Sequence, residues 1–124
     1  MKLYVLSMEK EIIIYHNPRW GKSRNSVGIL EGKGLSYNII QYINTPLSSS
    51  ELKELGNKLG LKPKDFIRKG EQEFEDLNLS EKLDDDKALF DAMSKFPKLM
   101  ERPIVVNGDR ARIGRPPEKI LNLL

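Results

Sequence analysis

The spacing of apolar residues at the start of the chain predicts a strand, a helix and a second strand. Residues 11–15 contain three consecutive isoleucines, a run typical of a strand buried on both faces of a mixed sheet. Residues 22–31 have helical spacing, with Val27 and Leu30 expected to face the core. Residues 37–42 are rich in residues that favour strands. Because these elements follow one another so closely, we expect a right-handed crossover between two parallel strands.

Capping residues mark where the first two helices begin and end. Gly32 or Gly34 is placed to end the first helix, since glycine adopts the left-handed conformation common after a last helical turn. Ser48 and Glu51 have the spacing of a capping box, in which each side chain accepts from the other residue's backbone N–H. Gly60 then ends the second helix.

The segment from about residue 48 to residue 98 is predicted to be a helical insertion between two halves of one sheet. Pro63 is placed to start a short helix, where its missing N–H costs nothing. The spacing of apolar residues over 85–96 predicts a longer helix, which Pro97 ends. The positions expected to face the core are Leu52, Leu55, Leu59, Phe66, Ile67, Leu89, Phe90, Met93 and Phe96.

The last part of the chain predicts a hairpin and a final helix. The apolar residues 104–106 precede Asn107-Gly108, a strong signal for a two-residue turn, and residues 110–113 return as the partner strand. The final helix starts at Arg115-Pro116-Pro117 and carries Ile120, Leu121, Leu123 and Leu124. The order βαβ, helical insertion, ββα predicts an α/β fold on a mixed four-stranded sheet.

Length and composition narrow the class of protein. The 124 residues suit one domain, residues 11–124, after an N-terminal extension of residues 1–10. A content of 39% hydrophobic and 31% charged residues is typical of a solvated globule. The apolar stretch near the start is too short for a signal peptide, so a cytoplasmic location is expected. The sequence has no cysteine, which excludes disulfides, thiolate metal sites and thiol chemistry.

The net charge of +3 conceals an uneven distribution. Residues 71–91 contain nine acidic residues and two lysines, whereas the remainder is net basic. A solvated face explains this acidic run better than a metal site, because Asp84-Asp85-Asp86 lacks the alternating spacing and glycine turn of a calcium loop. The basic residues are too scattered to predict a nucleic-acid surface. We therefore expect no metal, nucleic-acid or membrane partner.

A candidate anion site follows the first predicted strand. That strand runs into His16-Asn17-Pro18, a turn signal, and the next helix begins with basic and hydroxyl-bearing residues. A helix start offers free backbone N–H groups and the positive end of the helix dipole, where oxyanions dock. The residues assigned to this loop are Asn17, Pro18, Arg19, Gly21, Lys22 and Arg24.

Five separate segments resemble, in sequence and in spacing, the glutaredoxin-dependent arsenate reductase (ArsC) family. They are Tyr15-His16-Asn17-Pro18, Lys22-Ser23-Arg24-Asn25, Arg68-Lys69, Glu101-Arg102-Pro103-Ile104-Val105-Val106 and Gly114-Arg115-Pro116. The resemblance extends over residues 11–124, and agreement of several motifs is more specific than a match to one short pattern. It implies a thioredoxin-like fold, for which the predicted order of elements is typical.

The resemblance also implies roles for individual residues. His16 and Ser23 match positions that lower the pKa of the family's nucleophilic thiol, and Pro103 matches its cis-proline. Guanidinium groups suit tetrahedral oxyanions because they donate paired hydrogen bonds in a fixed plane. The positions that match the family's arsenate-binding arginines are Arg68, Arg102 and Arg115. The ligand implied is a small oxyanion such as arsenate, phosphate or sulfate.

Trp20 is where the sequence departs from the family. The corresponding family residue is a cysteine that attacks arsenate and later forms a mixed disulfide with glutathione. Indole has no comparable nucleophile, and the chain has no other cysteine. The expectation is therefore a family member without thiol-dependent arsenate reduction, which binds no cofactor and for which glutathione and glutaredoxin would be co-substrates only if that activity were present.

Several alternatives stay open from the sequence alone. The arginines beside prolines can have structural roles and pair with the acidic segment, Pro103 can be an ordinary trans proline, and His16 can be a hydrogen-bonded residue at a strand end. Trp20 can cover the arginine pocket by cation–π stacking or lie exposed as an anchor for a protein partner. The chain can also be a substituted form of an active reductase, or a protein-binding regulator like the Spx transcription factors, which share this fold and bind RNA polymerase.

Overall fold

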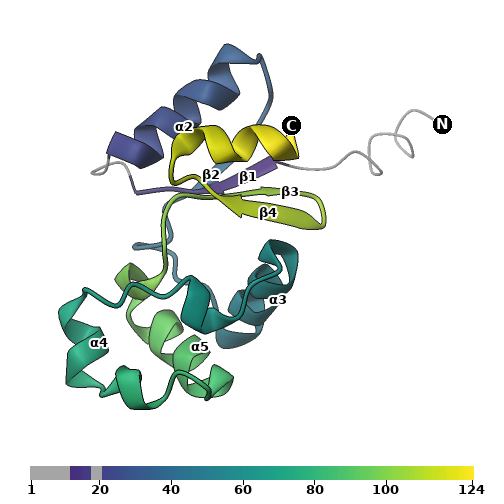
Figure 1. Ribbon diagram of the computed structural model, residues 1–124. Coiled ribbons are helices and arrows are strands. Elements are labelled where there is room, and N and C mark those ends of the chain that lie inside the picture. The colour runs from purple at the N-terminus through teal and green to yellow at the C-terminus, as the bar shows by residue number, and fades with distance from the viewer. Residues whose placement is uncertain (1–11, 18–20) are drawn as a thin grey trace.

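Four short strands form one mixed sheet in the computed structural model, which describes residues 12–17 and 21–124 (Figure 1). The strands are β1 (Ile12–Tyr15), β2 (Asn38–Ile40), β3 (Ile104–Asn107) and β4 (Arg110–Ile113), in the spatial order β2-β1-β3-β4. β1 pairs in parallel with β2 and antiparallel with β3, and β3 pairs antiparallel with β4. The predicted α/β fold on a mixed four-stranded sheet is confirmed. Residues 1–10 lie outside the described residues, as do Pro18, Arg19 and Trp20.

The predicted crossover from β1 to β2 is made by α2 (Gly21–Gly32). Leu30 is fully buried on its inner side. The helix ends through Gly34, which has a φ of 67° and donates its N–H to the carbonyl of Glu31, while Leu35 donates to Leu30. These two bonds are those of a Schellman motif, which requires a residue that tolerates positive φ at that place. Gly34 rather than Gly32 is therefore the terminating glycine.

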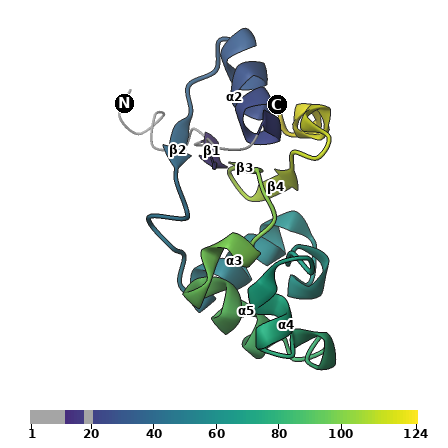
Figure 2. The ribbon, with the colours of Figure 1, turned by 90° about the vertical axis from the view of Figure 1, so that its left-hand side faces the viewer.

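Side chains alternate between the two faces of the sheet and so create two cores. Ile12, Ile14 and Val105 face α2 and the C-terminal 3₁₀ helix η4 (Pro117–Leu123). Ile104 and Val106 face the opposite way, toward the helical insertion. Figure 1 and the perpendicular view in Figure 2 show α2 and the C-terminal helix on one side of the sheet and α3, α4 and α5 on the other.

The helical insertion lies between β2 and β3 in the sequence, as predicted. Its elements are α3 (Ser49–Leu59), η1 (Pro63–Asp65), α4 (Gln72–Asp76), η2 (Leu79–Glu81), α5 (Asp86–Lys95) and η3 (Pro97–Leu99). The predicted capping box is present: Ser48 accepts from the Glu51 backbone N–H, and the Glu51 side chain accepts from that of Ser48. Gly60 ends α3 in the left-handed conformation. The capping residues in the sequence therefore predicted both ends of α3 correctly.

Two expectations about the insertion need correction. No helix was predicted in the acidic segment, yet it forms α4 and η2, because Phe74 and Leu79 are buried in the core and fix the chain around them. The helix expected to run on after Pro63 is a single 3₁₀ turn that ends at Asp65. Its continuation is extended because Ile67 pairs with Met100 in an isolated β-bridge.

The hairpin between β3 and β4 turns one residue later than predicted. Asn107 pairs with Arg110, so the two loop residues are Gly108 and Asp109. Gly108 has a φ of 67°, which suits the first central position of a type II′ turn. β2 is also shorter than the predicted strand over residues 37–42, because it is an edge strand that pairs only with the four-residue β1.

The final helix has 3₁₀ rather than α geometry, and this changes which leucines it buries. In a 3₁₀ helix, side chains three residues apart lie along one line. Ile120 and Leu123 share such a line and are buried, whereas Leu121 and Leu124 lie on the next line and are exposed. All four had been expected on one helix, and only two of them contribute to the core.

None of the helices in the described part of the chain is both long and apolar enough to cross a membrane.

The contact at Gly114 gives a test of the packing. A Cβ added there would lie 2.5 Å from the Ser26 hydroxyl oxygen and 2.9 Å from Pro103 Cγ. Because both neighbours are buried, we expect Gly114→Ala to lower the free energy of unfolding by about 1–3 kcal/mol. Urea denaturation measures the change.

Gly28→Ala is the matched control. A Cβ on this helical glycine meets no described atom within 4 Å, so the substitution should raise stability by about 0.5–1 kcal/mol. Equal stability of the Gly114→Ala variant and the wild type would contradict the packing described here.

Candidate functional site

A short antiparallel pairing brings Arg68 and Glu101 side by side. The Arg68 N–H donates to the Leu99 carbonyl at 2.7 Å, and the Glu101 N–H donates to the Phe66 carbonyl at 2.9 Å. The bridge between Ile67 and Met100 lies between these two bonds, and both side chains are buried. The backbone therefore fixes Arg68, from the insertion, beside the residue that precedes Arg102.

Arg115 reaches the same place from the end of β4. The Gly114 N–H donates to the Pro103 carbonyl at 2.8 Å, which holds the segment after β4 against the segment before β3. The Arg102–Pro103 peptide bond is cis, the geometry that the resemblance implies for Pro103. The Arg115–Pro116 bond is also cis, which nothing in the sequence had indicated.

Two arginines donate to the same carboxylate oxygen. Arg68 Nη1 lies 2.8 Å from Glu101 Oε1, and Arg115 Nη1 lies 2.9 Å from that same oxygen. Arg68 Nε also contacts Glu71 Oε1 at 3.2 Å. These are charge-assisted hydrogen bonds, which are stronger than neutral ones. Glu71 belongs to the acidic segment, whereas Glu101, which both arginines share, lies outside it.

Arg102 is the buried member of the arginine group, with 5% of its surface exposed. Burial, and then the positive charge of Arg68, lower the pKa of Arg102. Burial raises the pKa of the neighbouring Tyr42 to about 12, although the charge of Arg102 opposes this shift. A guanidinium is charged at every pH that proteins tolerate, so the site contains three positive charges and a neutral phenol.

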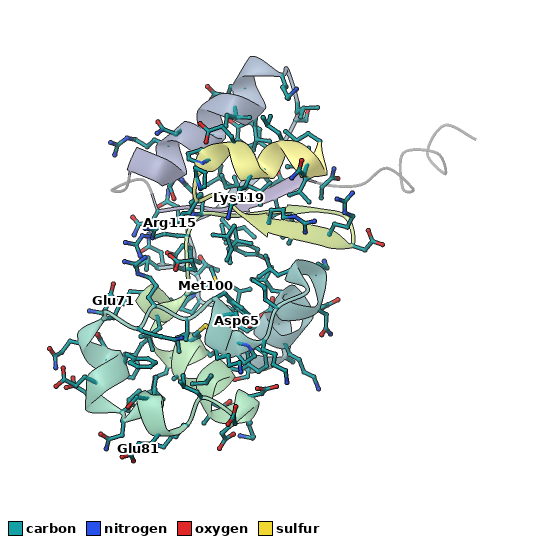
Figure 3. All side chains as sticks on the ribbon, viewed as in Figure 1. Asp65, Glu71, Glu81, Met100, Arg115 and Lys119 are labelled. Carbon is teal, nitrogen blue, oxygen red and sulfur yellow. The ribbon has the colours of Figure 1, made fainter. Side chains whose placement is uncertain are left out.

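A surface hollow of about 430 Å³ opens beside the arginines. Four cationic and two acidic residues, an isoleucine and a glycine line it: Lys64, Lys69, Arg68, Arg115, Asp65, Glu101, Ile67 and Gly70. The side chains of Arg68, Glu101 and Arg115 are 21%, 24% and 37% exposed, so solutes can reach all three. Figure 3 shows Arg115 and Met100 at the level where the sheet meets the insertion.

His16 and Ser23 form the other part of the site: His16 follows β1, and Ser23 lies in the first turn of α2. The fully buried Ser23 hydroxyl accepts a hydrogen bond from the Asn17 N–H at 3.3 Å. His16 is buried, and its backbone N–H donates to the Ile40 carbonyl at 2.9 Å. Its Nδ1 has no hydrogen-bond partner among the described residues, so the backbone of His16, and not this ring nitrogen, makes the expected strand-end bond.

These two parts meet at one end of the sheet. His16 follows β1, Pro103 precedes β3 and Gly114 follows β4, and the antiparallel pairing places those three strand ends together. Contact among Ser26, Pro103 and Gly114 brings α2 against the same place. A helix start and a group of arginines therefore share one end of the sheet, an arrangement suited to a small anion.

Comparison with known proteins decides the family. The sequence model of the ArsC family matches residues 15–123. The chain belongs to the ArsC family. It is 44% identical over 115 residues to an arsenate reductase of Haemophilus influenzae, a match that covers 91% of this chain and 98% of that protein. It is 41% identical over 118 residues to YfgD of Escherichia coli K12, covering 94% and 99% of the two chains.

A solved structure agrees with this ArsC-family assignment. The arsenate reductase from Vibrio cholerae superposes with a TM-score of 0.89 at 44% sequence identity, covering 94% of this chain and 99% of that one. The thioredoxin-like fold expected from the motifs is thereby confirmed.

The remaining predicted loop residues of the ArsC-family chain are only partly described. Gly21 and Arg24 lie in the first turn of α2, and both are exposed. The backbone of Lys22 is in the same turn, but its side chain lies outside the described part, as do Pro18, Arg19 and Trp20. The two alternatives for Trp20, over the arginines or exposed, both stay predictions.

Sequence reasoning missed one member of the site. Glu101 entered only as the first letter of a motif, although it accepts from two of the three arginines. The sequence did contain a clue to its role: Glu101 is an acidic residue directly before Arg102, in the short segment between the insertion and β3. A carboxylate beside guanidinium groups is expected to pair with some of them, but the sequence alone does not identify which arginines these are.

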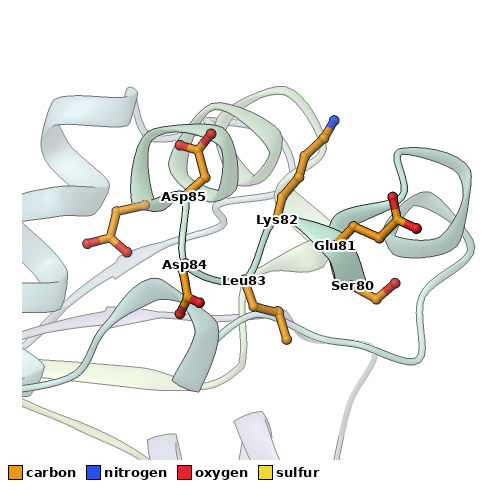
Figure 4. A pocket seen from close by; sticks show the side chains of 7 residues that line it. Ser80, Glu81, Lys82, Leu83, Asp84 and Asp85 are labelled. Atoms are coloured by element: carbon orange, nitrogen blue, oxygen red, sulfur yellow. The ribbon is translucent and has the colours of Figure 1, made fainter.

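The acidic segment lines a hollow of its own. Figure 4 shows Glu81, Asp84 and Asp85 pointing in different directions around a hollow formed by residues 80–86. Across residues 12–17 and 21–124, no three His, Asp or Glu side chains gather as a metal site would require.

The burial of His16 makes the stability of the folded chain depend on pH. Burial, and then the charge of Arg24, lower the pKa of His16. The unfolded chain therefore binds a proton at a higher pH than the folded chain does. The stability due to neutral His16 is complete above about pH 6.5 and is lost as the pH falls below it.

NMR titration of this residue, the sole histidine in the sequence, should give a pKa below the ordinary value. Urea unfolding should show the wild type losing more stability than His16→Gln between about pH 7 and about pH 5. Parallel losses in the two proteins would show that His16 is not the group responsible.

Proposed function

We propose that this ArsC-family protein binds a small tetrahedral oxyanion of the arsenate, phosphate or sulfate class through Arg68, Arg102 and Arg115. We also propose that it does not reduce arsenate by a thiol mechanism. The observation that carries the first part is the convergence of Arg68 and Arg115 on one carboxylate oxygen, at 2.8 and 2.9 Å. Two guanidinium groups aimed at one anionic oxygen are the central element of an oxyanion site.

The accessibility and charge of the site support anion binding. Arg68 and Arg115 are partly exposed and line an open hollow with more cationic than acidic side chains. Each guanidinium has five N–H donors in a fixed fork. Arg115 uses Nη1 for Glu101, which leaves donors for a ligand oxygen. Arg102 is buried, and its charge lies close enough to Arg68 for the two to affect each other.

The composition supports the second part of the proposal. Arsenate reduction in this family needs a thiolate near the start of the helix after β1, and a thiolate requires cysteine. This sequence has no cysteine, and the corresponding residue is Trp20. Glutathione and glutaredoxin therefore have no sulfur partner on this chain, and the protein needs no bound cofactor for anion binding.

Anion binding can be tested directly by isothermal titration calorimetry with phosphate and arsenate. Arg68→Ala and Arg115→Ala should each raise the Kd about tenfold or more, because each removes a charge-assisted bond to the anion. Arg110→Ala is the matched control, since this exposed arginine lies at the far end of β4 and contacts the Asn122 carbonyl. Equal weakening by all three substitutions would indicate nonspecific attraction instead of a site.

The loss of redox chemistry can be tested by restoring the thiol. The wild type should show no arsenate reduction above background in an assay that couples glutathione and glutaredoxin to NADPH oxidation. Trp20→Cys should gain turnover, because cationic surroundings at a helix start favour the thiolate. Trp20→Ser is the control for removal of the indole alone, and it should stay inactive. Robust turnover by the wild type would refute the argument from the missing cysteine.

A further inference from the structure

We infer that Glu101 makes the arginine site selective for tetrahedral oxyanions that carry a proton, phosphate and arsenate, over sulfate, which carries none. This inference rests on the proposed function, because it assigns the ligand class of the same site. It concerns a residue that contacts two of the arginines and also lines the hollow that the anion would enter.

The geometry of Glu101 leaves one carboxylate oxygen for a ligand. Both Arg68 and Arg115 donate to Oε1, so within the described residues the ion pairs concentrate on a single oxygen. Oε2 belongs to the same planar group, on a side chain that is 24% exposed. An ionised carboxylate only accepts hydrogen bonds. An anion that reaches the arginines therefore meets the Glu101 carboxylate, which can form a hydrogen bond only with a ligand group that donates one.

The tetrahedral oxyanions differ in whether they offer that donor. Near neutral pH, phosphate and arsenate keep at least one hydroxyl, whereas sulfate has only acceptor oxygens. A phosphate hydroxyl can donate to Oε2 while its other oxygens accept from the guanidinium groups. Sulfate in the same place would put an acceptor against a carboxylate, with repulsion and no hydrogen bond between them.

Glu71 is the other carboxylate near Arg68, and it serves as the comparison. It accepts from Arg68 Nε at 3.2 Å but is not among the residues that line the hollow. Its side chain is as exposed as that of Glu101, 24% in each case. Removing the charge of Glu71 therefore weakens an ion pair to the same arginine without removing the carboxylate that lines the hollow.

The test compares the Kd of phosphate with that of sulfate, measured by calorimetry at neutral pH and constant ionic strength. In the wild type, phosphate should bind about tenfold or more tightly than sulfate, the size expected for one hydrogen bond to a charged group. Glu101→Gln should remove most of this ratio, since a neutral amide can donate to sulfate. Glu101→Asp keeps the carboxylate and should retain a preference for phosphate. Glu71→Gln should leave the ratio at the wild-type value.

The outcomes separate this inference from the proposed function. If the wild type and Glu101→Gln both bind anions with the same ratio, the selectivity role is wrong while the oxyanion site stands. If Glu101→Gln strengthens phosphate and sulfate equally, Glu101 only occupies the arginines, and the inference is again overturned. If neither protein binds either anion, the proposed oxyanion site itself is wrong.

Discussion

The arrangement at this end of the sheet depends on the ion pairs of Glu101. Guanidinium groups gathered in a small volume repel one another, and burial and then the charge of Arg68 lower the pKa of Arg102. Glu101 offsets it by accepting from Arg68 and Arg115 on one oxygen. Removing this carboxylate would leave Arg68 with Glu71 as its ion-pair partner and would take away the contact that Arg115 makes with Glu101. The same contact therefore holds the side chains of Arg68 and Arg115 together at one point.

The sequence predicted those parts of the fold that depend on local chemistry. The three isoleucines of β1 identified a central strand, and the capping box at Ser48 located the start of α3 to the residue. The order of elements and the motifs then identified the family, and with it the three arginines. Each of these signals lies within a few residues of the feature it predicts, or in a pattern shared with relatives.

The errors arose where contacts distant in sequence decide the local structure. The acidic segment folds because Phe74 and Leu79 enter a core built by other helices, and the chain at Ile67 is extended because Met100 pairs with it across the insertion. The hairpin turn is set by the register of Asn107 against Arg110. Glu101 was overlooked for the same reason, since its two partners lie 33 and 14 residues away.

The arginines proposed to bind an anion and the position of the family's thiol belong to different parts of this chain. The backbone places Arg68 by pairing with residues 99–101, and it places Arg115 through the bond between Gly114 and Pro103. Neither device involves residue 20, which lies before α2. Tryptophan in place of the family's cysteine removes the reacting sulfur, while the backbone bonds that place Arg68 and Arg115 are made by other residues. The proposed oxyanion site therefore depends on the arginines and their backbone contacts, and not on a thiol at residue 20.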